Sequence, residues 1–593
     1  MHRLTKKTGL TGKAGRILAV LLALTLAAGM LAGCVGKEEK SSGLKDKIKQ
    51  SAQEDEGKKE SGKKKKKKSG AGEEKKEEAA ETAEAGVTPL EHVYVKDGYD
   101  YNWDQEYNEV AINYTYETIC LGKESAEKYP ELEKQLAVVN DLIVTEEANC
   151  YQAAEREYAA MDAETKSDGF DYGMLPYKQD WKVYARRADS AVFSVLTTAV
   201  TYSEIDYNDY RFVGYNYDPE TGRELELSDV VADMDAFISL IADEVIDEMM
   251  EEIPDDLEYD KDDVIDSVTA NLKEGARGNW TLDPEGVSVW FDSYTLLPTP
   301  IHYTLLFAED EDGSLFTDTY RDKTPENWTM VIPLYIREKI LSDDGKKPDY
   351  LIIGESYETY EEDDYEFIEG IRTVCNGDED TFVLGDDIYD TGITLAHLNG
   401  KNVLLVQYKD YEWGFMDTFT IHRGRIQGAD SIPGDLATVS WDELGPDDYA
   451  LPKRVLTDPA NFVACTYTDM LSTCSATKSY LLTEDGDFEP QENYYTIVED
   501  AQYEITLKHD MSGLQMVDER RNEVMSTDVD LKKGDTFKMI YTDDSSYVDG
   551  LSADGVLVRI EVFVYPDEGG RYVKTDDGDI AVYEAFDDMK FAG

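Results

Sequence analysis

The chain has 593 residues, and its 126 Asp and Glu against 59 Lys and Arg give a formal net charge of −67 at pH 7. Such a surface repels nucleic acid, so an electrostatic nucleic-acid binder is excluded and cationic partners are favoured. Hydrophobic residues make up 41% of the chain and include 40 Tyr, which is enough for cores in three or four domains of ~100–200 residues each. A charge that only keeps an exported protein soluble would explain the same composition.

The first 33 residues have the pattern of an export signal. Four basic residues between positions 6 and 16 precede an apolar run at 17–31, and small residues lead into Cys34. The run is shorter than the ~20 residues of a comfortable membrane-spanning helix. The alternative is an uncleaved N-terminal helix with an incidental cysteine.

The Leu-Ala-Gly-Cys string that ends at Cys34 resembles the lipobox of bacterial lipoproteins. In that family the cysteine thiol accepts the lipid, such as palmitate, and becomes the first residue of the mature chain. The resemblance implies that residues 1–33 are a cleaved signal peptide and that Cys34 is the lipidation site. It also implies an anchor on the extracytoplasmic face of the cell membrane.

Residues 34–88 read as a disordered tether. They are rich in Lys and Glu, lack aromatic residues and include six consecutive lysines at 63–68. Such a segment cannot bury enough apolar surface to fold, and as a flexible coil it spans on the order of 40 Å. The lysines could rest on anionic lipid or be merely solvated, and both interpretations stay open.

Residues 89–345 contain predicted strands and two predicted helices. A β-rich stretch at 107–119 is followed by a predicted helix at 129–161. The buried face of this helix is predicted from apolar residues that recur every three or four positions. Strands are predicted from a β-branched run at 189–203, on both sides of a turn at 218–222 and at 286–291, and residues 328–341 close the region. A second helix is predicted to begin after Ser228 or Asp229 and to end at Pro254.

This order of elements resembles the extracellular domain of the anti-sigma-V lysozyme receptors, which also accompanies a bacterial peptidoglycan deacetylase. The most specific pieces are the aromatic strand, Thr-Gly turn and Leu-x-Leu-Ser-Asp of residues 215–231, and the Gly-Val-x-Val-x-Phe of residues 286–291. The resemblance implies that residues 89–345 are an α+β region with helices on an antiparallel sheet. It also implies lysozyme as a ligand. The chain departs from the family because its sequence contains neither a transmembrane helix nor a cytoplasmic sigma-binding segment, so anti-sigma activity is not expected. The contact residues of the family cannot be placed on this chain.

The remaining sequence is β-rich in two parts. Residues 346–492 are predicted to be a hairpin domain, with turns at Asn399-Gly400, Arg423-Gly424 and Asp485-Gly486. Residues 493–593 are predicted to be a small domain that resembles an SH3-like barrel. Its apolar residues alternate strictly over 556–564, which predicts a strand with one core face, and residues 578–586 are predicted to form another strand.

The sequence predicts no catalytic, metal or cofactor site and therefore no enzyme. Besides His2 in the predicted signal peptide, five histidines are scattered without a metalloprotease motif. Ser356 lacks the second glycine of a nucleophile elbow because Glu358 replaces it. The acidic turns at 307–315 and 483–490 do not have the spacing of a calcium loop. The five histidines are His92, His302, His397, His422 and His509.

Five cysteines besides Cys34 have no spacing typical of zinc ligands. Export would permit disulfides, and Cys465 with Cys474 or Cys120 with Cys150 are candidate pairs. The odd number leaves one thiol over, and the pairing stays open. The five are Cys120, Cys150, Cys375, Cys465 and Cys474.

Together these features predict a membrane-anchored extracytoplasmic lipoprotein that binds a protein or glycan ligand, with lysozyme and cell-wall material as candidates. The predicted partners include the membrane, through Cys34, and exclude nucleic acid. Two alternatives stay open: a cell-wall-acting enzyme with an unrecognised site, and a structural envelope protein. The sequence specifies neither the binding residues nor the oligomeric state.

Overall fold

A computed structural model describes residues 86–590 with internal gaps. The predicted signal peptide, Cys34 and the tether up to residue 85 lie outside the described residues. The chain divides into two units, residues 1–85 with 148–161, and residues 86–147 with 162–593. The gaps are 172–174, 203–208, 253–260, 275–277, 297–299, 312, 335, 342–347, 354–356, 362–363, 376–377, 386–388, 411–412, 423–424, 437–452, 517–523 and 566–569.

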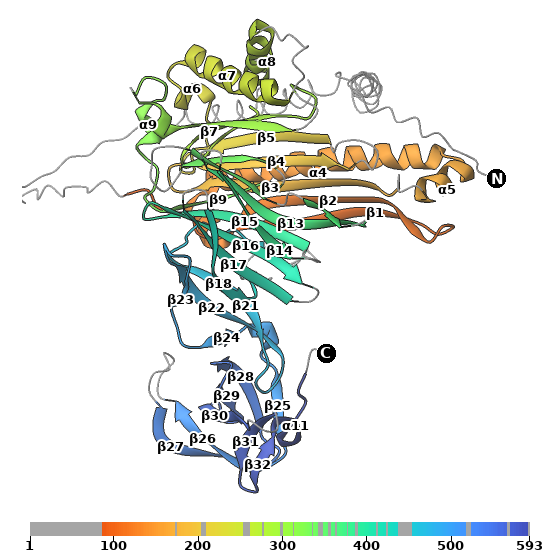
Figure 1. Ribbon diagram of the computed structural model, residues 1–593. Coiled ribbons are helices and arrows are strands. Elements are labelled where there is room, and N and C mark those ends of the chain that lie inside the picture. Colours follow the sequence, from red (N-terminus) through yellow and green to blue (C-terminus); the bar gives the residue numbers. More distant parts are fainter. Residues whose placement is uncertain are drawn as a thin grey trace, which may run out of the picture. The chain divides into compact units, whose positions relative to one another are not determined.

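The first sheet has six strands in the order β20-β1-β2-β3-β4-β5 (Figure 1). All neighbours are antiparallel except β2 and β3, which are parallel and therefore need a long crossover. Three helices supply it: α3 (Lys123–Lys128), α4 (Pro130–Ala160) and α5 (Ala163–Asp171). The strands are β1 (Val93–Asp104), β2 (Glu109–Leu121), β3 (Tyr177–Ala188), β4 (Phe193–Thr201), β5 (Asp209–Tyr217) and β20 (Lys453–Arg454).

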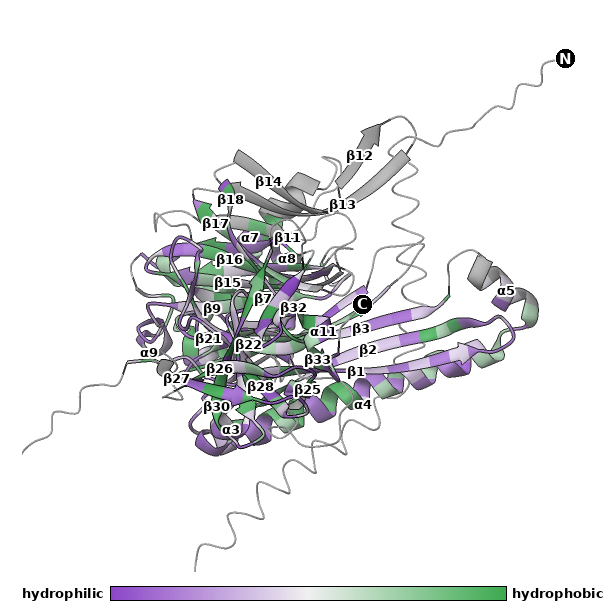
Figure 2. Cartoon of the chain, turned by 90° about the horizontal axis from the view of Figure 1, so that it is seen from below, coloured by the Kyte–Doolittle hydropathy of each residue, from purple (hydrophilic) through white to green (hydrophobic). Residues whose placement is uncertain are grey.

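The first half of α4 packs on this sheet (Figure 2). Its predicted buried face is confirmed, because Leu132, Leu136, Val139 and Ile143 are all 3% exposed or less. They share a core with apolar residues of β3, β4 and β5. The hydrophobic period of the sequence therefore positions the helix correctly.

A second core lies between α7 (Met234–Glu252), α8 (Lys261–Glu274) and a three-stranded sheet. The strands are β6 (Trp280–Leu282), β7 (Gly286–Phe291) and β8 (Ile301–Leu306). The predicted long helix is found as α7, but it begins at Met234 rather than directly after Ser228 or Asp229. Those two residues lie inside the short α6 (Leu227–Val230), whose N-cap is Glu226, and Val231 then forms a β-bridge with Phe316.

Two five-stranded sheets follow. One has the order β18-β17-β16-β15-β9, and the other has β10-β11-β13-β12 with β14 beside β13. The predicted turn at Asn399-Gly400 is confirmed, with φ of 50° and 82°. The strands are β9 (Trp328–Val331), β10 (Glu338–Leu341), β11 (Pro348–Ile353), β12 (Tyr357–Glu361), β13 (Asp364–Cys375), β14 (Asp378–Gly385), β15 (Tyr389–Leu398), β16 (Lys401–Asp410), β17 (Trp413–His422) and β18 (Arg425–Pro433).

The C-terminal strands form a 14-stranded sheet whose described pairings do not close into a barrel. Val558, Ile560 and Val562 face its core as predicted, whereas Val564 is 53% exposed. The sheet contains β19 (Asp435–Leu436), β21 (Phe462–Thr468), β22 (Cys474–Leu482), β23 (Phe488–Pro490), β24 (Tyr495–Ile497), β25 (Glu504–Leu507), β26 (Met511–Met516), β27 (Val524–Leu531), β28 (Thr536–Thr542), β29 (Tyr547–Ser552), β30 (Leu557–Val564), β31 (Arg571–Thr575), β32 (Gly578–Ala581) and β33 (Phe586–Asp587).

Within the described residues the protein is therefore a mixed α and β structure that is mostly sheet, with an all-β region after α9 (Asp318–Arg321) apart from single helical turns such as α11 (Val582–Ala585). This agrees with the expected α+β class at that level. None of the described helices is long and apolar enough to cross a membrane.

Candidate functional site

Three large aromatic side chains of β1 are exposed to solvent. Tyr99, Tyr101 and Trp103 are 62%, 57% and 48% exposed. Side chains alternate across a strand, so these three residues share one face of the hairpin formed by β1 and β2. Asp100, which lies between the two tyrosines, interacts with Glu147 of α4 and so marks the opposite face. We call the side that carries the three aromatic residues the aromatic face.

The hairpin holds the aromatic face in a fixed geometry. Its strands are 12 and 13 residues long and pair antiparallel almost without interruption. At the turn, Asp104 accepts hydrogen bonds from the N–H groups of Glu106 and Tyr107, at 2.8 and 3.3 Å. The Tyr107 hydroxyl donates to the carbonyl of Ala163, at 2.8 Å, and so fastens the turn to the start of α5.

Polar side chains lie next to the aromatic residues on the same face. Thr115 of β2 is directly opposite Tyr99, and its hydroxyl donates to Asp180 of β3 at 2.5 Å. The Tyr202 hydroxyl donates to the other oxygen of Asp180, at 2.7 Å. Burial and the Asp180 carboxylate raise the pKa of Tyr202, so this phenol stays neutral at neutral pH.

An ion pair bounds the aromatic face on its inner side. Lys182 of β3 lies 2.9 Å from Glu117 of β2, which also accepts a hydrogen bond from the N–H of Val183. Burial disfavours the charged form of Lys182, but Glu117 more than offsets that cost, so the pKa of Lys182 is raised. Lys182 is therefore charged at neutral pH and stays paired with Glu117.

The hairpin is acidic. Residues 96–109 contain five Asp or Glu and a single Lys. Two of these acids bind lysines outside the hairpin, Asp97 with Lys453 at 3.3 Å and Asp104 with Lys166 at 3.6 Å. The hairpin combines rigid Tyr and Trp side chains with Asn and Gly. This composition is typical of binding surfaces, where Tyr and Trp supply most of the binding energy. The aromatic face and the acidic residues around it are therefore suited to binding a ligand.

The other predicted candidates lie elsewhere. Ser356 is outside the described residues. Cys465 and Cys474, a candidate disulfide pair, are free thiols that lie opposite Thr477 and Thr468 on paired strands. Burial raises the pKa of both thiols to about 11. Among the described residues no group of three or more His, Cys, Asp or Glu could hold a metal ion.

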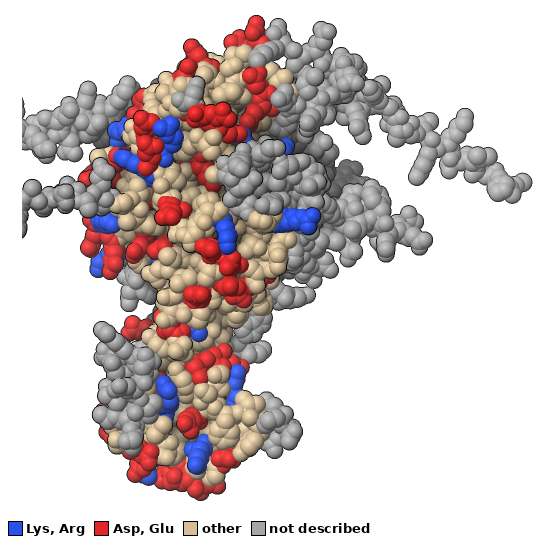
Figure 3. Space-filling model, turned by 60° about the vertical axis from the view of Figure 1, so that its left-hand side comes forward, with Lys and Arg blue, Asp and Glu red and all other residues tan. Residues whose placement is uncertain are grey.

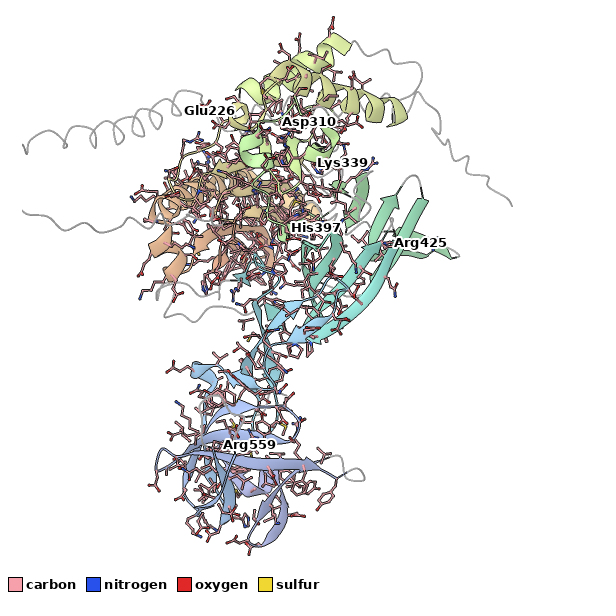
Figure 4. The ribbon with its side chains drawn as sticks, turned by 90° about the vertical axis from the view of Figure 1, so that its left-hand side faces the viewer. Glu226, Asp310, Lys339, His397, Arg425 and Arg559 are labelled. Carbon is pink, nitrogen blue, oxygen red and sulfur yellow. The ribbon has the colours of Figure 1, made fainter. Side chains whose placement is uncertain are left out.

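The acidic turns use their carboxylates internally. Asp310 accepts hydrogen bonds from the N–H groups of Ser314, Leu315 and Phe316, so it holds its own loop (Figure 4). Asp485 binds Lys401 at 2.7 Å. These bonds account for the Gly-containing acidic turns that the sequence raised as calcium candidates.

One buried histidine, His302, lies beside a buried carboxylate. His302 is 3.5 Å from Glu338 and stacks on Trp290 with ring centroids 4.2 Å apart. The side chains of His302 and Glu338 are both only 1% exposed, and Glu338 is bound by Arg186. We therefore assign this pair a structural role in the core rather than acid–base chemistry.

Sequence reasoning did not identify the aromatic face. The signal is the alternation of Tyr, Tyr and Trp with Asp and Asn at 99–103. Alternation marks one face of a strand but does not say whether that face is buried.

Comparison with known proteins adds little. No protein-family model and no curated relative matches the chain. Among solved structures it is similar to a DUF3298 family member from Bacteroides fragilis, with a TM-score of 0.29 and 11% identity over 40% of this chain and 98% of that one. A DUF3298 family protein from Pseudomonas aeruginosa gives a TM-score of 0.23 and 9% identity over 38% and 95%. Neither likeness carries an argument about function at these TM-scores.

Proposed function

We propose that this protein is a lipid-anchored, extracytoplasmic binding protein whose aromatic face docks a cationic protein. Cys34 would hold it in the membrane, and residues 34–88 would carry the folded part away from the lipid. Residues 89–345 would serve as an ectodomain of the lysozyme-receptor type, which makes lysozyme the first ligand to test.

The exposure of Tyr99, Tyr101 and Trp103 carries this proposal. A soluble surface rarely gathers large aromatic residues unless they mark an interaction site. The acidic hairpin around them favours a basic partner, because opposite charge steers encounter and sets specificity.

Tyr99 and Tyr101 form a paired aromatic surface. The Tyr99 and Tyr101 rings lie against each other, with centroids 6.0 Å apart and planes 26° from parallel. Two aromatic rings held side by side in this way can enter a pocket on a protein partner.

Titration of lysozyme into the full-length protein in detergent would test the proposal. We expect binding that weakens steeply between about 50 and about 300 mM NaCl, as screening of a charged interface requires. The triple variant Y99S/Y101S/W103S should weaken binding by at least about 30-fold, the effect of losing one or more hot-spot residues.

The matched control is Y467S/Y583S, which removes tyrosines that are 51% and 66% exposed outside the aromatic face. It should bind as the unmodified protein does. An equal loss in both variants would contradict the assignment of the site. Binding to purified peptidoglycan, without lysozyme binding at low salt, would replace the protein ligand with a glycan.

A further inference from the structure

Glu147 is a buried carboxyl group without a hydrogen-bond partner. It lies on α4, is 1% exposed, and neither carboxylate oxygen has a partner in the described structure. Other buried carboxylates differ, because Asp189, Asp283 and Asp549 each bind an arginine. A buried charge without such a partner is costly, so Glu147 needs another explanation.

Its acidic neighbour is Asp100, on the reverse of the aromatic face. The two carboxyl groups are close enough for a hydrogen bond when one of them holds a proton. By register, Tyr114 of β2 lies opposite Asp100, and Gln179 of β3 lies beside Tyr114, so an acid, a phenol and an amide come from the three strands on this side. Burial first, and then Asp100, raise the pKa of Glu147 to about 7.

A shared proton explains this pair better than a metal ion. Calcium takes about six to eight oxygen ligands, and two carboxyl groups supply too few. No described group of three or more acidic, His or Cys side chains could complete a site. A proton needs only the two carboxyl groups.

We propose that Asp100 and Glu147 form a proton-dependent latch that holds the β1–β2 hairpin on α4. When the pair shares a proton, the hairpin is docked and the aromatic face is ordered. When both groups are ionised, their repulsion and the buried charge release the hairpin. The consequence for ligand binding rests on the proposed function, whereas the latch does not.

The direction with pH follows from the raised pKa of the docked state. The latch is complete below the ordinary glutamate pKa of about 4.5, weakens as the pH rises to about 7, and changes no further above that. A shift of this size allows the opening constant to rise by up to about two orders of magnitude.

Hydrogen exchange on the full-length protein, corrected for intrinsic rates, measures the latch directly. We expect amide protection in residues 96–115 to fall on the order of 100-fold between about pH 5 and about pH 8. E147Q should keep its protection at both values, because the amide cannot ionise. Glu146 is exposed on the same helix, so E146Q removes the same charge and should behave as the unmodified protein.

Three outcomes would overturn the latch. These are equal protection of the unmodified protein at both pH values, an E146Q variant that matches E147Q, and protection restored at high pH by millimolar CaCl2, which would assign the site to a metal. An equal melting temperature of E147Q and unmodified protein at the lower pH verifies that the variant folds.

Lysozyme affinity at the same two pH values tests the coupling separately. We expect the unmodified protein to lose affinity at the higher pH and E147Q to retain it. Equal affinities alongside a change in protection would overturn the coupling while the latch stands. Absence of lysozyme binding at both pH values, with the protection change intact, would count against the proposed function alone.

Discussion

Arg186 shows how a single residue connects several sheets. It lies on β3 with no exposed surface and binds Asp283 at 2.6 Å and Glu338 at 2.7 Å. Glu338 belongs to β10, and Asp283 follows β6, so the guanidinium joins strands of three sheets. Burial would raise the pKa of Glu338, but Arg186 outweighs it and the pKa is lowered. The carboxylate is therefore charged and depends on its partner.

Replacing Arg186 with Leu should destabilise the protein by ~3–5 kcal/mol, because two carboxylates would stay buried without their cation. Urea unfolding followed by Trp fluorescence measures this, since Trp290 lies against the guanidinium with 5.2 Å to its ring centroid. R211L is the control. Arg211 is 47% exposed and 3.9 Å from Asp209, so its loss should cost less than ~1 kcal/mol.

The triple variant R186M/D283L/E338L sharpens this test. Removing all three charges at once should recover much of the lost stability, because the penalty comes from unpaired buried charge rather than from the pair itself. A small effect of R186L alone, or a triple variant less stable than R186L, would contradict this account.

At the scale of elements, the hairpin of β15 and β16 depends on two residues with positive φ. Asn399 and Gly400 have φ of 50° and 82° between strands that pair Leu398 with Lys401. A two-residue turn of this kind matches the twist of its strands but disfavours side chains at the second position. The sequence could predict it because the requirement is local.

Gly400→Ala should cost about 1 kcal/mol or more, although nothing lies within 4 Å of the added methyl group. The cost is conformational and not steric. Gly428→Ala on β18 is the control, since that glycine is not among those with positive φ and its nearest neighbour would be Phe419 at 3.9 Å. Thermal melting of both variants separates these effects, and equal melting temperatures would contradict the turn argument.

Elements that depend on distant partners could not be predicted in this way. Asp229 does help to start a helix, but as the third residue of α6 and not as the cap of the long helix, because its carboxylate accepts the N–H of the N-cap Glu226 at 2.9 Å. The helix nevertheless stops at Val230, since Val231 pairs with Phe316, 85 positions later in the sequence. Residues 578–586 were predicted to be one strand, but β32 ends at Ala581 and α11 follows, with Val582 and Ala585 buried in the core.

The candidate site shows the same limit. The strand at 107–119 and the helix at 129–161 were predicted from local pattern, and both are found with small shifts of their ends. The exposure of Tyr99 was not predictable, because it depends on which side of the sheet α4 covers. In the sequence Glu147 is one of many acidic residues, and only the packed structure shows that its carboxyl group is buried.

At the scale of the whole molecule, charge dominates. Acidic side chains are spread over the face shown in Figure 3, with fewer basic ones between them. Several basic side chains are already engaged. Lys339 bridges Glu244 and Glu309, and Arg559 binds Asp549 with two hydrogen bonds of 2.8 Å. Acidic side chains outnumber the basic side chains that can pair with them, so the protein keeps an excess of negative charge.

Self-repulsion of this excess should make stability depend on ionic strength. A net charge of −67 disfavours the compact state, and salt screens repulsion between exposed charges. Salt also weakens exposed ion pairs, but each contributes little, and buried pairs such as that of Arg186 are screened far less. Repulsion should therefore be the larger effect.

We expect the melting temperature to rise by several degrees between about 10 and about 300 mM NaCl at neutral pH. Sucrose at matched osmolality separates screening from general exclusion effects, and a melting temperature that falls with salt would mean that exposed ion pairs outweigh the repulsion.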